Sequence, residues 1–471
     1  MPVTADQMLT WCRVLLGTDE RPHATLEEYL RAVPRLDQLS DLPPGTPVLV
    51  RGDVDAKPGK MIGEGDVRLR SMVETLRFGI DRGWKQVVFG HIGRDPKGSL
   101  TKVAVRLGEL LECEVPLVAG WLDESTSQIT DAASRAVASA APGSVLMLEN
   151  TRAYAIERML WKAKADDLSG LAESLATLAN SFAERVARAY VNEALSAGSL
   201  DASSTIVPAA MDRVALGRYV ASEFDGPMLR CQRAEMVVFS GLKADKLDDL
   251  EAMIARGTVR SVISAGSLAM ALKKADALLA GRDFGLGLAE DPAHADKPFY
   301  IPPARIEQAR RMLASGREQG VEFVLPVDFL LADGKRSETI GPGQQQLDIG
   351  PQSSEQFANA VGRFLAAQQS RPRKERGAVF YNGVFGKFED PQFEEGTRRF
   401  IPQLKRLTDA GIEVYVGGGE GGAALEKYGQ PDWVTHCFTA GGTVLNALGS
   451  EPIPYLVALA MAAARGSALT R

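Results

Sequence analysis

The sequence has few of the residues that cross-link small secreted folds or bind metals. It contains four cysteines and four histidines among 471 residues, and both kinds are scattered along the chain. The cysteines are Cys12, Cys113, Cys231 and Cys437. Their spacing is neither that of a zinc site nor that of a disulfide framework. We therefore expect free structural thiols in a reducing cytoplasm and no His/Cys metal centre.

Long apolar runs and an excess of one charge are also missing. No apolar run reaches the roughly 18 residues of a membrane span. Residues 1–16 lack the cationic, apolar layout of a signal peptide. The chain has 54 basic and 60 acidic residues, a net charge of −6, which gives no indication of a nucleic-acid partner. We expect a cytoplasmic protein that binds neither membranes nor nucleic acid.

Short β-rich runs alternate with helix-period segments along nearly the whole chain. Pro47–Arg51 precedes Val67–Asp81, for example, and Gln86–Gly90 precedes Val103–Leu111. Continuous apolar strands interleaved with helices are typical of parallel sheets covered on both faces. Because 471 residues exceed one typical core, we predict an α/β protein. It should have two doubly wound, Rossmann-like parallel-sheet lobes joined by a hinge helix.

The strand–helix units fall into two groups. Between them, residues 209–224 have a helical pattern that ends at a Gly-Pro stop in Asp225-Gly226-Pro227. The predicted parts are an N-terminal extension (residues 1–40), a first lobe (41–208), a hinge helix (209–226) and a second lobe (227–454). We expect residues 455–471 to return to the first lobe.

The most informative segment is the glycine-rich loop Gly417–Gly422. It follows the β-rich run Ile412–Val416 and opens a helical segment. Glycines let the backbone approach an anion closely, and the first N–H groups of the helix point at it unpaired. Glu420 inside this loop would repel a bare phosphate, which makes sense if a divalent cation lies between the two. A plain strand–helix turn with a surface acid is the alternative.

Polar loops also follow the predicted strands of the first half. They are Arg51–Asp55, His91–Arg94 and Glu149–Arg152, with Arg68 shortly after the first. Ligands collect at the carboxyl ends of strands in open α/β sheets. Arginines converging there would form a cradle for a polyanion, since a guanidinium gives paired hydrogen bonds to phosphate or carboxylate. Asp53 would bond a hydroxyl or orient one arginine. Singly, each arginine could be an ordinary surface charge.

Small residues and lysines follow the strands of the second half. These loops are Ser240–Lys246, Ser264–Ser267, Asn382–Gly386 and Gly441–Thr443. A glycine-lined cleft with lysines and the Glu420 loop suits a nucleoside triphosphate. One lobe that holds an anion and one that holds a nucleotide indicate a hinge-closing phosphotransferase.

In order, these loops resemble the motifs of the phosphoglycerate kinase family, from about residue 45 to residue 460. The family's V-L-V-R-x-D-x-N-x-P resembles Val48–Pro58, with one residue added. Its G-G-G-D loop resembles Gly417–Glu420. Further matches are Gly90–Asp95 (S-H-x-G-R-P), Met147–Arg152 (L-L-E-N-x-R), Leu325–Asp328 (L-P-V-D), Asp348–Pro351 (D-I-G-P), Tyr381–Glu389 (W-N-G-P-x-G-x-F-E) and Phe438–Thr443 (S-T-G-G-G-A).

The resemblance implies a role for each matching residue. The acid substrate would be bound by Asp53, Asp55, Arg68, His91, Arg94 and Arg152. Arg68, Lys243, Lys246, Gly418 and Gly419 would be catalytic, with Arg68 bridging the phosphoryl group in flight. ATP or ADP would be bound by Lys246, Gly266, Asn382, Gly383, Glu389, Gly417, Gly418, Gly419, Glu420 and Gly421. Glu420 would stand at the position of the family's magnesium aspartate. The cofactors implied are ATP/ADP and Mg²⁺.

The sequence also departs from the family pattern. The family's substrate arginine falls on Leu200, and both histidines of that loop are absent. Asp55 replaces an asparagine, and Lys243 is displaced by one residue. The family's glycine-triplet loop reads Ser264–Gly266 here. A lost charge-assisted contact is worth roughly 1.5–3 kcal/mol, so phosphoglycerate binding should be weakened and the site re-specialised.

Three functions are therefore compared. The leading hypothesis is an ATP- and magnesium-dependent kinase that phosphorylates a carboxylate, with 3-phosphoglycerate or a related carboxylic or hydroxy acid as acceptor. The second is a non-catalytic ligand-binding or scaffold protein that contacts a partner through residues 1–40. An unrelated doubly wound sugar or acid kinase is the third, and the ordered series of motifs argues against it. We expect a monomer whose partner is a small carboxylic acid.

Overall fold

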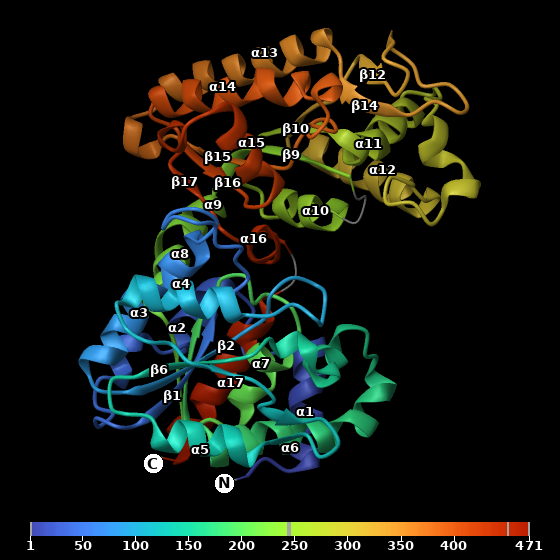
Figure 1. Ribbon diagram of the computed structural model, residues 1–471. Coiled ribbons are helices and arrows are strands. Elements are labelled where there is room, and N and C mark those ends of the chain that lie inside the picture. Colours follow the sequence, from blue (N-terminus) through green and yellow to red (C-terminus); the bar gives the residue numbers. More distant parts are fainter. Residues whose placement is uncertain (1, 243–245, 450–451, 470–471) are drawn as a thin grey trace. The chain divides into compact units, whose positions relative to one another are not determined.

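The computed structural model describes residues 2–242, 246–449 and 452–469. Its elements form two compact units, Met1–Asp225 together with Pro452–Arg471, and Gly226–Glu451. Each unit has a six-stranded sheet with helices around it (Figure 1). The prediction of two α/β units built on parallel sheets is confirmed.

The sheet of the first unit is parallel throughout, in the order β3-β6-β2-β1-β7-β8. Its strands are β1 (Pro47–Gly52), β2 (Lys85–Phe89), β3 (Leu117–Val118), β6 (Val145–Leu148), β7 (Ala189–Glu193) and β8 (Arg213–Leu216). All of β6 and β7 is buried. This burial explains why these strands read as unbroken apolar runs rather than as alternating patterns. Because every strand runs the same way, the carboxyl ends share one edge.

Helices surround this sheet and include both ends of the chain. They are α1 (Ala5–Leu16), α2 (Leu26–Ala32), α3 (Val67–Asp81), α4 (Thr101–Leu111), α5 (Asp131–Ser139), α6 (Leu168–Arg185), α7 (Ala202–Thr205), α8 (Arg218–Glu223) and α17 (Pro454–Leu469). A small hairpin joins β4 (Leu122–Asp123) and β5 (Gln128–Ile129). The last helix, α17, drawn in red, contacts α2, α7 and β8 of this unit (Figure 1).

The N-terminal residues are helical and pack on the first unit. Thr4 caps α1, since its side chain accepts a hydrogen bond from the N–H of Gln7, whose side chain bonds back to Thr4. Gly17 ends the helix in the left-handed conformation, with φ of 70°. The buried side of α1 contacts α6, and the N–H of Val3 bonds to Asn180.

The expected hinge helix over residues 209–226 is wrong for much of its length. Residues Arg213–Leu216 form β8, which pairs with β7 at the edge of the sheet. The helical parts are the end of the 3₁₀ turn Val207–Ala210, α8 and the π-helical turn Phe224–Met228. A short apolar run fits a strand and a helix equally well. Here the run forms a strand of the sheet, in which Val214, Ala215 and Leu216 are all buried beside β7.

The second unit has its own parallel sheet, in the order β11-β10-β9-β15-β16-β17. The strands are β9 (Ala234–Gly241), β10 (Ser261–Ala265), β11 (Glu322–Val324), β15 (Ala378–Asn382), β16 (Glu413–Val416) and β17 (His436–Cys437). A smaller antiparallel sheet contains β12 (Phe329–Leu331), β13 (Arg336–Ser337) and β14 (Gln346–Ile349).

Helices cover both faces of the larger sheet, with α13 and α14 on one side and α10, α11 and α12 on the other (Figure 1). The helices are α9 (Leu229–Cys231), α10 (Leu247–Ala255), α11 (Gly266–Leu279), α12 (Pro303–Glu318), α13 (Pro351–Gln369), α14 (Glu395–Asp409), α15 (Glu420–Tyr428) and α16 (Gly441–Leu448). The rings of Phe357 and Phe400 both pack on Phe385, at 5.4 and 5.0 Å between centroids. This aromatic contact links α13 and α14 to the loop after β15.

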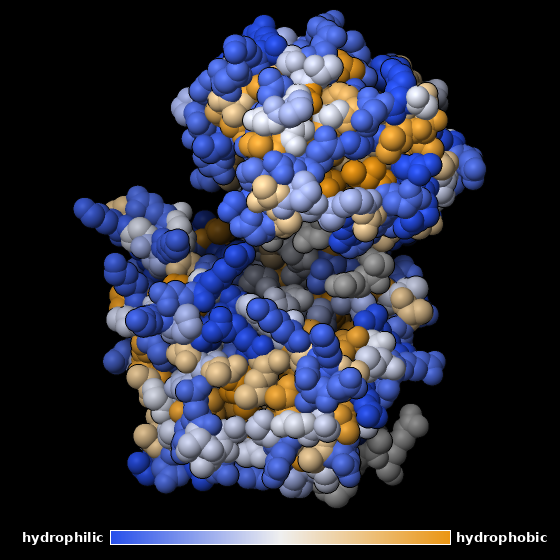
Figure 2. Space-filling model, turned by 90° about the vertical axis from the view of Figure 1, so that its right-hand side faces the viewer, coloured by the Kyte–Doolittle hydropathy of each residue, from blue (hydrophilic) through white to orange (hydrophobic). Residues whose placement is uncertain are grey.

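The surface is mostly hydrophilic in the view of Figure 2, with apolar residues in limited areas. Such areas are normal for a protein surface facing water. Within the described ranges, no helix has both the length and the apolar character needed to cross a bilayer.

Candidate active site

Charged side chains from several strands meet at the carboxyl edge of the first unit's sheet. Arg51 lies near the end of β1, His91 follows β2 and Arg152 follows β6. Asp201, in the segment after β7, lies among them. All four residues are buried, with Asp201 fully inaccessible. Buried charges need partners, so their contacts define the site.

Arg51 makes contacts with every part of its guanidinium group. Nε donates to Oγ of Ser203 at 2.9 Å, and Nη1 donates to the carbonyl of Gly52 at 2.7 Å. Nη2 lies 2.9 Å from Nδ1 of His91 and 3.7 Å from the Asp201 carboxylate. With only 1% of its surface exposed, Arg51 is an internal positive charge that organises this edge.

His91 is a neutral side chain in this environment. Burial, together with three neighbouring guanidinium groups, lowers the pKa of His91 to about 2. Its Nδ1 therefore accepts the hydrogen bond from Arg51, and Nε2 carries the proton. The Asp201 carboxylate lies 3.4 Å from Nδ1, but with a neutral ring this contact is not an ion pair. Both groups face Arg51 as acceptors.

Arg152 and Trp161 hold the Asp201 carboxylate from the other side. Nη2 of Arg152 lies 3.4 Å from Oδ2 of Asp201, and the indole N–H of Trp161 donates to Oδ1 at 2.8 Å. The Arg152 guanidinium also stacks over the Trp161 ring at 4.8 Å. Nη1 of Arg152 donates to the carbonyl of Gly93 at 2.7 Å. Asp201 is thus surrounded by donors.

Arg68, in the first turn of α3, is held by two acids of the loop after β1. Its Nη1 donates to the backbone carbonyl and the carboxylate of Asp55, at 3.1 and 3.2 Å, and lies 3.7 Å from Asp53. Asp53 is buried, and this burial raises its pKa. Oδ1 of Asp53 accepts from Ser196 at 2.8 Å. Among the described residues Oδ2 has no hydrogen-bond partner.

Two predicted positions lie outside these contacts. Arg94 is exposed and takes no part in the hydrogen bonds just described. Leu200, at the position of the family's substrate arginine, is half-buried. The structure therefore brings together Asp53, Asp55, Arg68, His91 and Arg152 of the six predicted acid-binding residues.

Sequence reasoning missed two acids of this edge, Asp201 and Glu157. Glu157 is 4% exposed and accepts hydrogen bonds from Thr151 and Ser203. Burial and the nearby Asp201 carboxylate raise the pKa of Glu157. Glu157 belongs to no recognised motif, and Asp201 stands beside Leu200 at a position that the family pattern leaves open. The acid-site cluster, as the term is used below, comprises Arg51, Asp53, Asp55, Arg68, His91, Arg152, Glu157 and Asp201.

In the second unit, the loop between β16 and α15 is shaped by its glycines. A Cβ atom on Gly418 would come within 2.6 Å of the carbonyl oxygen of Phe438. Gly419 has a φ of 71° with open space around it, so its backbone conformation, not crowding, requires glycine. Glu420 then begins α15. The free N–H groups of this helix start are therefore open to an anion.

The strand ends beside this loop carry polar atoms without partners. Asn382 ends β15 and is 4% exposed, and within the described part of the chain its Nδ2 has no hydrogen-bond acceptor. The buried Oγ of Ser240, near the end of the neighbouring strand β9, is also unpaired there. Gly383 follows with a φ of 92°. Unsatisfied buried donors are costly, and a phosphate oxygen would satisfy them.

The lysine loop is only partly described. Lys243 lies outside the described residues. Nζ of Lys246 lies 3.4 Å from the carbonyl of Ser240 and 5.9 Å from the centroid of the Phe239 ring. Gly266 opens α11 with a φ of 66°, and a Cβ there would come within 2.9 Å of the carbonyl of Gly241. Lys246 and Gly266 therefore both lie at the carboxyl end of β9.

Glu389 and Glu420 are both exposed. In the described ranges no three His, Cys, Asp or Glu side chains cluster to hold a metal. A magnesium ion often takes only one or two carboxylates and completes its shell with phosphate and water. A lone Glu420 in the glycine loop would fit that pattern if the loop held a phosphate. Gly421, directly after it, is buried.

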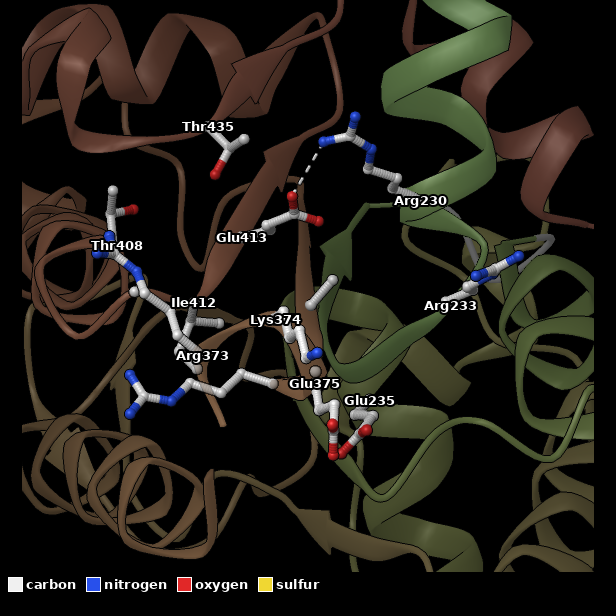
Figure 3. Close-up of a pocket in the computed structure, with 14 residues that line it drawn as sticks. Arg230, Arg233, Glu235, Arg373, Lys374, Glu375, Thr408, Ile412, Glu413 and Thr435 are labelled. Carbon is white, nitrogen blue, oxygen red and sulfur yellow. Dashed lines mark hydrogen bonds and ion pairs between the residues drawn. The ribbon is translucent and has the colours of Figure 1, made fainter. Parts of the chain in front are cut away.

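A separate pocket of about 880 Å³ lies at the opposite, amino edge of the second unit's sheet (Figure 3). Its lining has more basic than acidic side chains; Arg230 pairs with Glu413 at 3.1 Å, and Glu235 accepts from Arg371 at 2.6 Å. Because it borders the starts of β9, β15 and β16, this pocket is not part of the glycine-loop site.

Asp348 holds the start of α14 and should make the second unit sensitive to pH. Its carboxylate accepts from the N–H groups of Gly396 and Ile349, both at 2.8 Å. Burial nevertheless raises the pKa of Asp348 from 3.8 to about 7. Between about pH 3.8 and 7, the folded state therefore keeps a proton that the unfolded state releases. The protonated carboxyl contributes stability that is complete below pH 3.8 and is lost as the pH rises through about 7.

We expect Asp348→Asn to remove this pH dependence. At pH 4 the variant should be less stable than the wild type, because an amide group replaces one of the two oxygens that accept from N–H groups. Towards pH 8 this difference in the free energy of unfolding should shrink by up to about 4 kcal/mol, because only the wild type loses stability as the pH rises. Urea unfolding at both pH values measures the change. Asp333→Asn, an exposed acid paired with Lys335, is the control. Equal pH slopes in wild type and Asp348→Asn would contradict the assignment.

Comparison with known proteins identifies the family. A family model described as phosphoglycerate kinase matches residues 39–451, most of the chain. The chain belongs to the phosphoglycerate kinase family. The resemblance inferred from the loops is thereby confirmed. Since members of this family are kinases, the chain is assigned as a phosphoglycerate kinase-like phosphotransferase.

Curated phosphoglycerate kinases match nearly end to end. The phosphoglycerate kinase of Clostridium beijerinckii is 29% identical over 430 residues, covering 88% of this chain and 96% of the relative. That of Synechococcus elongatus is 30% identical over 434 residues, covering 88% and 95%. The cytosolic enzyme of Triticum aestivum is 28% identical over 436 residues, covering 88% and 95%.

Solved structures of phosphoglycerate kinases share the fold. The enzyme from Pyrococcus horikoshii OT3 matches with a TM-score of 0.68 at 23% identity, covering 92% of this chain and 100% of that one. The enzyme from Coxiella burnetii matches with a TM-score of 0.64 at 22% identity, covering 90% and 98%. At these identities the likeness concerns the fold, and the substrate must be argued from the site.

Proposed function

We propose that this protein transfers the γ-phosphoryl group of ATP to a carboxylate and so forms an acyl phosphate. The acceptor is 3-phosphoglycerate or a related carboxylic or hydroxy acid. The observation that carries the proposal is the buried Nδ2 of Asn382 beside the Gly417–Gly419 loop, which has no acceptor among the described residues. A buried donor next to a helix start with free N–H groups is suited to phosphate.

The residues of the second unit would hold the nucleotide. Asn382 and the N–H groups of Gly418 and Gly419 would donate to phosphate oxygens, and Lys246 would add a positive charge. Lys243 would contact the phosphates, and Glu389 would contact the ribose. Glu420 is the carboxylate that would hold Mg²⁺, which, when bound, offsets charge on the β- and γ-phosphates.

The residues of the first unit would hold the acceptor. Oδ2 of Asp53, which has no hydrogen-bond partner among the described residues, would accept a hydrogen bond from a substrate hydroxyl. Arg68 is held through Nη1 by the acids of the loop after β1, and 26% of its side chain is exposed. Its guanidinium would bridge the phosphoryl group as it moves, and stabilising that charge is where such catalysis obtains its rate.

A second function is favoured by one specific observation. Asp55 and Asp201 place negative charge against the arginines that would bind an anionic acid. A protein that had lost turnover and kept only ligand binding could tolerate this. Under either function, we expect a cytoplasmic monomer, and the wheat relative carries the word cytosolic in its name.

Trapping with hydroxylamine separates the two functions. With ATP, Mg²⁺ and hydroxylamine, we expect a hydroxamate from at least one acid of a panel that pairs each phosphorylated acid with its unphosphorylated form. An acyl phosphate reacts with hydroxylamine, whereas a phosphate ester does not, so the product reports carboxylate phosphorylation. ATP binding without hydroxamate from any acid would favour the non-catalytic protein.

A further inference from the structure

The Asp201 carboxylate occupies the middle of the basic groups in the first unit. Its Oδ2 lies 3.4 Å from the Arg152 guanidinium and 3.7 Å from that of Arg51, while Oδ1 accepts from Trp161 at 2.8 Å. A carboxylate held between two guanidinium groups occupies the kind of position that an anionic ligand would take. The chain supplies this anion itself.

The Asp201 side chain is fixed in this place. It has no exposed surface, so bulk water cannot screen its charge. Its backbone carbonyl accepts from the hydroxyls of Ser204 and Thr205, at 3.1 and 2.8 Å. Ser203, two residues on, is held by Glu157 and by Arg51. Moving Asp201 away would therefore break bonds along the whole segment.

The acid-site cluster consequently has no excess of positive charge. The basic members are Arg51, Arg68 and Arg152, and the acids are Asp53, Asp55, Glu157 and Asp201. His91 adds no positive charge, because it is neutral. Three basic and four acidic side chains nearly cancel in charge, and burial raises the pKa values of Asp53 and Glu157. The cluster is thus close to balanced and offers little attraction to a dianionic phosphate group.

We propose that Asp201 is a specificity-determining residue, an internal counter-ion that makes the first unit select carboxylic acids without a phosphate group. This inference rests on the proposed function and narrows its substrate class. A phosphorylated acid would place two further negative charges near a buried carboxylate in a low-dielectric site, where like charges repel strongly. An unphosphorylated hydroxy acid carries a single negative charge, so it meets less of this repulsion.

Calorimetric titration with two probes, glycerate and 3-phosphoglycerate, tests this proposal on the full-length protein without nucleotide. The wild type should bind glycerate more tightly than 3-phosphoglycerate. Asp201→Asn and Asp201→Ala should bind 3-phosphoglycerate about 10- to 100-fold more tightly than the wild type. Their glycerate affinity should change less than about threefold. Asp212→Asn is the matched control, since it removes one acid paired with Arg188 at the opposite edge of the same sheet, and should leave both affinities unchanged.

Two results would overturn the proposal. One is that the wild type binds 3-phosphoglycerate more tightly than glycerate; this measurement does not depend on the folding of any variant. The other is unchanged 3-phosphoglycerate affinity in both Asp201 variants with a wild-type circular dichroism spectrum. Hydroxamate formation, measured separately, keeps the two claims apart. If the Asp201 variants bind 3-phosphoglycerate more tightly but no hydroxamate forms, the proposed function alone is wrong. If hydroxamate forms from an acid whose affinity is the same in the wild type and the Asp201 variants, this inference alone is wrong.

Discussion

Replacing Arg68 with alanine is expected to reduce phosphoryl transfer at least about 10³-fold, while ATP affinity changes less than about twofold. The guanidinium is the cation of the acid-site cluster that is neither fully buried nor bound to Asp201, since 26% of its side chain is exposed. An arginine at the moving phosphoryl group stabilises charge that exists mainly in the transition state. Because Arg68 belongs to the first unit and the predicted nucleotide residues to the second, binding of ATP should be spared.

Single-turnover hydroxamate formation and separate ATP titration measure the two quantities for Arg68→Ala. Arg68→Lys keeps the charge but not the planar fork, and should restore only part of the rate. Arg77→Ala is the matched control, because Arg77 lies on the same helix but is half-exposed and pairs with the exposed Glu112. Full activity in Arg68→Ala would refute its catalytic assignment, whereas equal losses in Arg68→Ala and Arg77→Ala would indicate damage to α3.

The fold could be predicted because buried parallel strands leave a strong sequence signal. Strands β6 and β7 are buried on both faces and read as apolar runs. Parallel strands place their following loops at one edge, which is why Asp53, His91 and Arg152 could be predicted to meet. The signal failed at β8, where an edge strand of four residues resembles a helix turn.

The acids that oppose the basic groups could not be predicted. Asp201 and Glu157 are single acidic residues in irregular segments, and such residues usually face water. What makes Asp201 special is its distance from Arg51 and Arg152, which are far from it in sequence and come close only in the folded sheet. The family motifs pointed to positions where residues are replaced, such as Leu200, and gave no weight to the neighbouring Asp201.

The burial that underlies the proposed selectivity of the acid-site cluster also makes the cluster important for the stability of the first unit. Arg51 and Asp201 are almost completely withdrawn from water, and a buried ion pair often contributes little net stability, because its desolvation cost offsets its attraction. Removing one partner is different, since the other charge is then left unpaired. The stability of the first unit should therefore depend on keeping the charges of this cluster matched.

Replacing Arg51 with methionine is accordingly expected to destabilise the first unit by about 3–5 kcal/mol. Methionine fills similar space but gives no donor to Ser203 or His91, and it leaves the Asp201 carboxylate with Arg152 as its remaining cationic partner in the contacts described above. Urea unfolding followed by tryptophan fluorescence measures the loss. The signal reports mainly on this unit, because Trp11, Trp84, Trp121 and Trp161 lie in it, whereas Trp433 lies in the second unit.

A double-mutant cycle with Asp201→Asn shows whether the loss comes from unmatched charge. If it does, Arg51→Met combined with Asp201→Asn should recover at least about 1 kcal/mol relative to Arg51→Met alone, since neutral groups in contact need no counter-charge. Arg188→Met breaks only the exposed pair with Asp212 and should cost at most about 1 kcal/mol. Strictly additive losses would mean that Arg51 acts by packing, and that Asp201 does not depend on it as a counter-ion.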